Sequence, residues 1–103
     1  MDAMLSAARL KQNETITFLR QLVECETPSH DTSSIERFAD LFSALVSDIA
    51  NVKTVRASRE FDPHLLCEFK LPGGRRKDGQ ILALGHSDTV YPIGTLSRMP
   101  FRV

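Results

Sequence analysis

The sequence predicts a layered α/β domain, and three observations carry that prediction. Residues 33–50 repeat apolar side chains at spacings of three and four, which is typical of an amphipathic helix. Residues 65–71 alternate apolar and polar side chains, which indicates a strand with one buried face. Residues 81–84 are apolar at every position, which favours a strand covered on both faces. Helices packed against a sheet that holds such a strand form an α/β layer structure.

The first helical stretch covers residues 4–23, where apolar side chains recur at helical spacing. Because Asn13 or Thr15 can cap a helix start inside this stretch, residues 1–12 form either a separate short helix or a loose arm.

The second helix has its own start signal. Pro28 disfavours helical geometry at the residue before it and breaks the chain ahead of this helix. Ser33 and Glu36 match a capping box, in which the two residues satisfy each other's free backbone donors. We therefore expect the helix to begin at Ser33 and to end near Ala50.

The strands and loops follow in order along the chain. Residues 52–57 are a weak strand candidate, and residues 58–63 are expected to connect it to the alternating strand as a hairpin loop. Residues 72–79 form an exposed turn, and we interpret its basic cluster as a solvated loop tip rather than an anion site. Ligands in open α/β sheets gather beyond the carboxyl ends of strands, so chemistry is expected just after Leu84.

Composition excludes several classes of function. The 103 residues carry 13 basic and 13 acidic side chains, so the formal net charge is zero. A balanced charge argues against nucleic-acid binding through a basic face and against a polybasic membrane contact. No apolar run approaches the roughly 20 residues of a membrane span, and the N-terminus lacks the basic opening of a secretory signal. We expect a cytoplasmic protein in which Cys25 and Cys67 are unpaired small hydrophobes.

His86 and Asp88 are the chemistry-bearing pair after the apolar strand. In an extended segment, residues two apart face the same side, so the imidazole and the carboxylate can act together. A histidine that binds a metal usually donates its other ring N–H to a carboxylate or a carbonyl, which fixes its tautomer. A purely structural hydrogen bond between the two side chains is the alternative interpretation.

The residues around His86 and Asp88 form a longer motif that is more specific than the pair alone. Residues 85–92 read Gly-His-Ser-Asp-Thr-Val-Tyr-Pro, and residues 94–96 and 99–103 continue it as Gly-Thr-Leu and Met-Pro-Phe-Arg-Val. This string resembles the di-zinc exopeptidase family of glutamate carboxypeptidase, aminoacylase and succinyl-diaminopimelate desuccinylase, and is most similar to the glutamate carboxypeptidase branch. Residues 19–23 and 26–29 are similar to the opening of that family, so the resemblance spans residues 16–103.

The resemblance implies a site and a reaction. His86 would be a ligand to one zinc ion, and Asp88 would take part in catalysis as the carboxylate that orients His86 and raises its basicity. The family hydrolyses amide bonds of small peptides or N-acyl amino acids at two Zn²⁺ ions, for which Co²⁺ is an alternative. The substrate-binding residues and the acyl group of the substrate are left open.

The resemblance also implies that residues 1–103 are the N-terminal portion of a metallopeptidase catalytic domain. The expected fold is then the N-terminal part of a layered zinc-exopeptidase domain, with two helices followed by a mixed sheet. The other metal ligands, the general base and the domain that often mediates homodimerisation would lie beyond Val103, so the chain alone should be inactive. A non-enzymatic truncated fragment or interaction module is the alternative. His30 and His64 lie in predicted loops and are expected to be surface residues.

Overall fold

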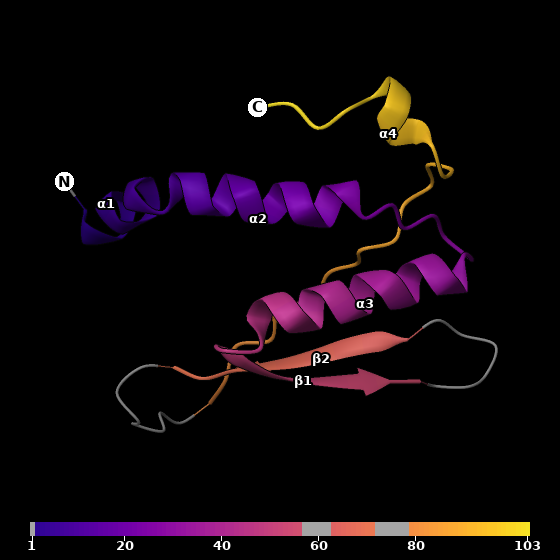
Figure 1. Cartoon of the computed structure of the whole chain (residues 1–103). Coiled ribbons are helices and arrows are strands. Elements are labelled where there is room, and N and C mark those ends of the chain that lie inside the picture. The colour runs from indigo at the N-terminus through magenta and orange to yellow at the C-terminus, as the bar shows by residue number, and fades with distance from the viewer. Residues whose placement is uncertain (1, 57–62, 72–78) are drawn as a thin grey trace.

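Figure 1 shows the computed structural model of the chain, in which residues 2–56, 63–71 and 79–103 are described. Helix α3 lies between α2 on one side and the β1–β2 hairpin on the other. The chain thus combines helices with a small antiparallel sheet, in agreement with the predicted α/β class. The elements in chain order are α1 (Ala3–Leu10), α2 (Gln12–Glu24), α3 (Thr32–Val46), β1 (Ala50–Val55), β2 (His64–Phe69) and α4 (Thr95–Arg98).

The first helical stretch is divided into two helices. Helix α1 begins after Asp2, whose carboxylate accepts the backbone N–H of Met4 at 2.8 Å. Lys11 joins the helices, since its N–H reaches the carbonyl oxygen of Ala7 at 3.2 Å and its own carbonyl accepts the N–H of Thr15 at 2.9 Å. Of the two alternatives for this region, the short separate helix is the one observed.

Helix α3 begins differently from the prediction. Its N-cap is Asp31, whose carboxylate accepts the backbone N–H of Ser34 at 3.0 Å. The capping box of Ser33 and Glu36 is therefore wrong: the helix already begins at Thr32, so the backbone N–H of Glu36 lies within the helix and needs no side-chain acceptor. Ser33 lies inside the helix and donates its hydroxyl to the same Asp31 carboxylate at 3.1 Å.

The end of α3 also differs from the prediction. The helix ends at Val46 rather than near Ala50, and the N–H of Ile49 closes a turn onto the Val46 carbonyl at 3.0 Å. Ala50 is the first residue of β1 instead. The apolar spacing in the sequence continues beyond the end of the helix because Ala50 is buried, at 3% exposure, in the strand that follows.

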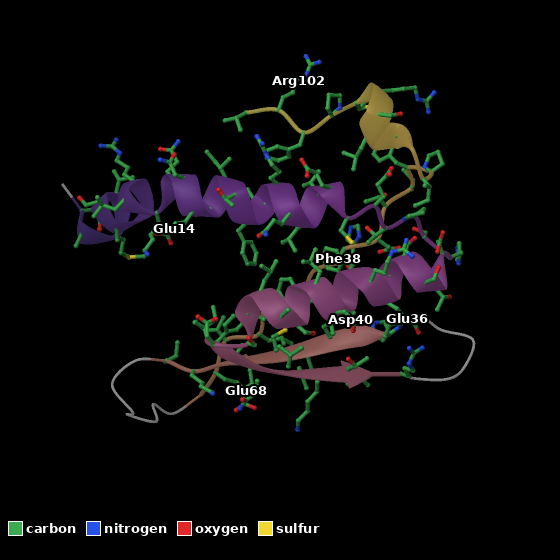
Figure 2. The ribbon with its side chains drawn as sticks, in the orientation of Figure 1. Glu14, Glu36, Phe38, Asp40, Glu68 and Arg102 are labelled. Atoms are coloured by element: carbon green, nitrogen blue, oxygen red, sulfur yellow. The ribbon has the colours of Figure 1, made fainter. Side chains whose placement is uncertain are left out.

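The two strands form an antiparallel pair with Val52 opposite Cys67. The alternation predicted for residues 65–71 is confirmed in part: Leu65 and Cys67 are half-buried and Leu66 is exposed. The prediction is wrong for Phe69 and Leu71, which are exposed, and β2 already ends at Phe69. Figure 2 shows Glu68 projecting from the hairpin away from α3. The predicted hairpin loop falls on residues that lie outside the described part of the chain, apart from Pro63, which is buried.

The core lies between α3 and its neighbours and is small. Its buried apolar side chains are those of Ile35, Ala39, Val46 and Ala50. An aromatic cluster joins α2 to α3: Phe42 packs edge-on against Phe18 of α2, with ring centroids 6.4 Å apart, and stacks on Phe38 at 6.1 Å. Figure 2 shows Phe38 on the side of α3 that faces α2. Aromatic pairs at these distances contribute about 0.5–1.5 kcal/mol beyond the area that they bury.

The predicted doubly buried strand is wrong. Residues 81–84 form no strand, and Ile81, Leu82 and Leu84 are 98%, 80% and 93% exposed. A strand of this kind needs a neighbouring strand on its edge and a layer on each face. Within the described residues β1 and β2 pair only with each other, so this apolar segment has neither, and the mixed sheet is not observed.

Two further sequence expectations concern helices and cysteines. In residues 2–56, 63–71 and 79–103, no helix combines the length and the apolar character needed to cross a membrane. Cys25 and Cys67 are both free thiols and both half-buried. The basic cluster of the turn at residues 72–79 lies outside the described residues.

Candidate functional site

The site depends on a contact between two segments that are about 60 residues apart in sequence. Residues 27–29 run parallel to residues 87–89 and form a single bridge between Pro28 and Thr89. The N–H of Thr89 reaches the carbonyl of Thr27 at 2.8 Å, and the N–H of Ser29 reaches the carbonyl of Thr89 at 2.8 Å. The Thr27 hydroxyl adds a third bond, to the carbonyl of Ser87 at 2.6 Å. We call this contact the seam.

Local sequence explains why residues 27–29 are extended. Helix α2 ends at Glu24, and Pro28 keeps the preceding residue out of helical geometry. The N–H of Asp31 then bonds to the Pro28 carbonyl at 3.1 Å, which closes a turn. His30 in that turn has a φ of 68°, a left-handed conformation that a non-glycine residue seldom adopts. The turn reverses the chain into α3 and leaves the side chain of Ser29 facing the seam.

His86 lies beside Asp88, as the sequence predicts. Its Nδ1 is 3.1 Å from the backbone oxygen of Asp88 and 3.3 Å from the carboxylate oxygen Oδ1. Both neighbours are acceptors, so the proton of the neutral ring belongs on Nδ1 and the lone pair on Nε2. The His86 side chain is 85% exposed, which leaves Nε2 accessible.

The carboxylate of Asp88 is held from its other side by Ser29. The Ser29 hydroxyl donates to Asp88 Oδ2 at 2.8 Å. This hydrogen bond is the main reason that the pKa of Asp88 lies below its ordinary value; slight desolvation opposes the shift, and His86 adds to it. Asp88 is therefore ionised at neutral pH and is a good acceptor for the ring N–H of His86.

A pocket of about 460 Å³ opens next to His86. Its walls come from the end of α2, from α3, from the seam and from α4, and its apolar lining includes Leu22, Val23, Phe38, Leu96 and Met99. A volume of this size, with an apolar lining and a few polar groups, is typical of small-molecule sites.

Two acidic or nucleophilic groups line the same pocket. Burial raises the pKa of the Cys25 thiol, with a smaller opposing effect from Arg37, so this thiol is not an activated nucleophile. The Glu26 carboxylate accepts the backbone N–H of Gly94, with oxygens at 2.9 and 3.1 Å, and so fixes the segment that leads into α4. These contacts therefore give neither the Cys25 thiol nor the Glu26 carboxylate a role beside His86.

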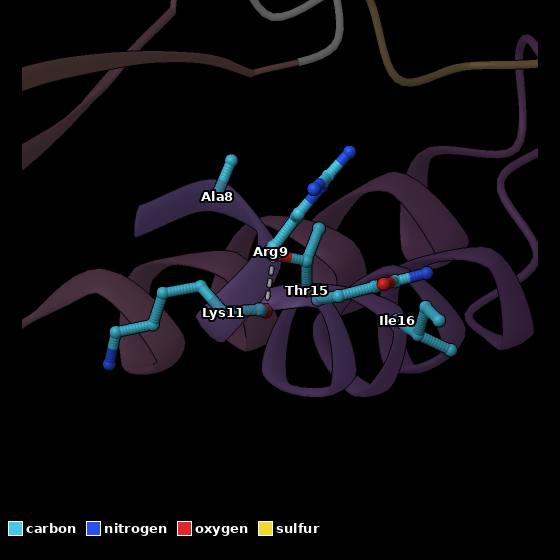
Figure 3. Close-up of a pocket in the computed structure, with 6 residues that line it drawn as sticks. Ala8, Arg9, Lys11, Thr15 and Ile16 are labelled. Atoms are coloured by element: carbon cyan, nitrogen blue, oxygen red, sulfur yellow. Dashed lines mark hydrogen bonds between the residues drawn. The ribbon is translucent and has the colours of Figure 1, made fainter. Parts of the chain in front are cut away.

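A second hollow, of about 380 Å³, lies at the junction of α1 and α2. Figure 3 shows that the Thr15 hydroxyl bonds to the Lys11 carbonyl there, at 2.9 Å, while the Lys11 side chain extends away from the junction. None of the six residues that line it was predicted to carry chemistry. We assign no site to it.

Zinc is the metal that the family resemblance implies, and the chain fits it in part. The accessible Nε2 of His86, with Nδ1 held by a carboxylate, is the arrangement that zinc-binding histidines usually show. In the described part of the chain, however, no three His, Cys, Asp or Glu side chains lie close enough together to hold a metal ion. The described residues thus place one accessible histidine nitrogen beside a carboxylate, and a complete zinc site would need further ligands.

The structure brings the two predicted site residues together and adds two that sequence reasoning missed. Ser29 and Thr27 contact the segment of residues 87–89. In the sequence they belong to the resemblance at residues 26–29, which predicts no role for either side chain. The order Thr-Pro-Ser just after a helix was the available signal, because Pro28 predicts an extended backbone on which hydroxyls can face a partner strand. His30 and His64 are both exposed, as expected, but His64 is the first residue of β2 rather than part of a loop.

Comparison with protein-family models, with curated proteins and with solved structures found no match to this chain. The functional interpretation therefore depends on the sequence motif and on the geometry of the seam.

Proposed function

We propose that this chain is the N-terminal portion of a zinc-dependent amide hydrolase, of the carboxypeptidase or N-acyl-amino-acid deacylase type. One observation supports this proposal most strongly. His86 is held through Nδ1 by the ionised Asp88, and its Nε2 is open to solvent beside an apolar pocket. Histidines that bind a metal usually donate their other ring N–H to a carboxylate or a carbonyl in this way.

The chain's own residues would act as follows. His86 would hold a zinc ion through Nε2, and Asp88 would keep the ring proton on Nδ1 and stabilise the positive charge that the ring gains on binding. Bound zinc supplies Lewis acidity that polarises an amide carbonyl and activates water. The pocket beside His86 would accept an apolar part of a small peptide or N-acyl amino acid.

The proposal places the remaining ligands and the general base outside these 103 residues. A catalytic zinc site generally needs three protein ligands and one open position. Since the described residues offer one, the isolated chain should not hydrolyse an N-acyl amino acid, and zinc should not change that result. A sequence continuing past Val103 with an aspartate and then a pair of adjacent glutamates would match the family pattern.

The proposal is tested on the full-length protein that contains this chain. We expect His86→Ala to remove one zinc ion and most of the turnover of an N-acyl amino acid. Asp88→Asn should retain zinc at high metal concentration and lose about 10–100-fold in metal affinity or activity, which is typical of a residue that acts through the ligand. His64→Ala, on the exposed face of β2, is the matched control and should leave both unchanged.

Zinc content measured by atomic absorption and initial hydrolysis rates decide the outcome. Unchanged zinc content and rate in His86→Ala would remove His86 from the site and overturn the proposal. A loss of zinc in Asp88→Asn as complete as that in His86→Ala would make Asp88 a direct ligand instead.

A second candidate, an interaction module, is favoured by one observation. The apolar segment at residues 81–84 is exposed along its length, and an exposed apolar segment of this kind often contacts another protein surface. Under this alternative, Leu82→Ser would abolish association with a partner, while His86→Ala would not. The two candidates therefore predict opposite sensitivities at neighbouring positions.

A further inference from the structure

We propose that Ser29 is a positioning residue for His86: by donating its hydroxyl to Asp88 Oδ2, it fixes the carboxylate whose other oxygen, together with the Asp88 backbone oxygen, selects the tautomer and the orientation of the imidazole. The role in metal binding rests on the function proposed above. The relay of hydrogen bonds from Ser29 through Asp88 to His86 requires no metal and can be tested on the chain itself.

The first step of the argument is where the Ser29 proton goes. The hydroxyl oxygen is 2.8 Å from Asp88 Oδ2 and 3.0 Å from the Thr89 carbonyl oxygen. A hydroxyl has one proton to donate, and the Thr89 carbonyl already accepts the Ser29 backbone N–H at 2.8 Å. The carboxylate is charged and nearer, so it is the stronger acceptor. The hydroxyl proton therefore lies toward Asp88.

The second step is that Ser29 is a rigid donor. Its backbone is held on one side by the seam bond to Thr89. On the other side, the bond from the Asp31 N–H to the Pro28 carbonyl closes the turn in which Ser29 lies. Its side chain is short, with one rotatable bond before the oxygen, so little freedom remains. A donor that is placed by two backbone contacts positions its acceptor at a low cost in entropy.

The third step is that Asp88 has few other constraints. Its side chain is 45% exposed, and among the described residues the side chains bonded to its carboxylate are those of Ser29 and His86. Without Ser29 the carboxylate can rotate toward water and leave the ring N–H of His86, for which the Asp88 backbone oxygen at 3.1 Å is then the remaining acceptor. A histidine ring in water favours the proton on Nε2, and a protonated Nε2 has no lone pair for a metal ion.

The experiment records the ¹⁵N chemical shifts of the His86 ring in the 103-residue chain at alkaline pH, where these shifts no longer change with pH and report the two neutral tautomers. We expect the wild-type ring to be mainly the Nδ1–H tautomer and Ser29→Ala to raise the population of the Nε2–H tautomer, because Nδ1–H then keeps only the Asp88 backbone oxygen as a fixed acceptor. Ser29→Thr keeps the hydroxyl and should restore the wild-type shifts. Ser47→Ala, which removes a hydroxyl bonded to the Ala44 carbonyl at 3.0 Å, is the matched control and should change nothing.

Backbone amide spectra of each variant show whether it folds. If Ser29→Ala loses the native spectrum, Ser29→Cys takes its place, because a thiol has nearly the size of the hydroxyl and is a weak donor. Wild-type tautomer populations in a folded Ser29→Ala or Ser29→Cys variant would overturn the inference, as would a failure of Ser29→Thr to restore them. Wild-type His86 found mainly as Nε2–H would overturn it as well.

A second measurement separates this inference from the proposed function. In the full-length protein, Ser29→Ala should lower zinc affinity, and by less than the roughly 10–100-fold expected for Asp88→Asn, because Ser29 acts on His86 only through Asp88. If the tautomer shifts in Ser29→Ala but the full-length protein neither binds zinc through His86 nor hydrolyses amides, the proposed function fails and the relay stands. If zinc binding and hydrolysis depend on His86 but Ser29→Ala leaves the tautomer populations of the ring unchanged, the relay fails and the function stands.

Discussion

Two neighbouring stretches of the chain, residues 81–84 and residues 86–89, differ sharply in how they are held. The first is the most apolar run in the sequence, yet its large side chains are exposed, and within the described residues its backbone forms no hydrogen bond. The second is more polar, yet the seam and two side-chain contacts tie it to residues 27–29. Hydrophobicity alone therefore does not decide which stretch is ordered by contacts.

The difference shows that extended chain is stabilised by its partners. The backbone N–H and C=O groups of an extended segment need partners, and both groups of Thr89 and the carbonyl of Ser87 find theirs on the segment that follows α2. Residues 81–84 offer apolar side chains but meet no neighbouring strand in the described structure. The seam therefore holds the candidate site residues in place while the chain just before them is exposed.

The largest expected effect comes from breaking the seam at its backbone. Thr89→Pro removes the N–H that bonds to the carbonyl of Thr27, and Thr27 is only 4% exposed. A buried acceptor left without its donor costs about 1–3 kcal/mol. We expect the free energy of unfolding, measured with urea, to fall by that amount.

Leu82→Pro is the matched control, because it introduces the same ring seven residues earlier in the exposed stretch. Leu82 is 80% exposed, and the described structure gives its N–H no partner to lose. Its effect should stay within about 0.5 kcal/mol. Equal losses in the two variants would mean that the two stretches do not differ in stability and would contradict the comparison.

A smaller effect is expected from the side chain of Thr27. Thr27→Val keeps the shape of the side chain and removes the hydroxyl that donates to the Ser87 carbonyl at 2.6 Å. A single hydrogen bond of this kind contributes about 0.5–1.5 kcal/mol, so urea unfolding should show a loss in that range. Thr15→Val removes a comparable hydroxyl bond, to the Lys11 carbonyl, on an exposed helix surface. A larger loss in Thr15→Val than in Thr27→Val would show that the seam hydroxyl adds nothing specific.

Local patterns in the sequence predicted α2, α3 and the hairpin because these elements depend on nearby residues, while α1 was left open and α4 was not predicted. The apolar period identified α3, and the alternation of Leu65 and Cys67 identified β2. The boundaries were less predictable, since Asp31 and Ser33 are both good caps and only the folded turn selects Asp31. The prediction of a strand at residues 81–84 was wrong because a strand forms only beside neighbouring strands, which local patterns do not reveal.

The candidate site was predictable only as far as its local part. His86 and Asp88 are two residues apart, so an extended backbone alone brings them together, and the sequence shows that pairing. Ser29 is 59 residues from Asp88, and its contact depends on a parallel bridge that no spacing rule indicates. The same holds for the pocket, whose walls come from four separate parts of the chain.

The smallest expected effect is on the acid dependence of stability. The Ser29 hydroxyl holds the pKa of Asp88 below its ordinary value, so the folded state binds a proton there less readily than the unfolded state does. The stabilisation from this group is therefore complete above the unfolded pKa of about 3.9 and is lost as the pH falls through the lower folded pKa. Asp88→Asn has no such proton to bind, so its urea midpoint should fall less than that of the wild-type chain between about pH 5 and pH 3.

The N-cap of α3 provides the comparison for this last effect. The pKa of Asp31 is also lowered, mainly by the backbone N–H of Ser34. The stabilisation from the ionised Asp31 is therefore also lost as the pH falls. Asp31→Asn keeps a good cap and should flatten the acid dependence independently of the seam. The double variant should therefore be flatter than either single variant, because Asp31 and Asp88 bond to different donors. An Asp88→Asn variant with the full acid sensitivity of the wild-type chain would show that the Ser29 hydroxyl does not hold this carboxylate in solution.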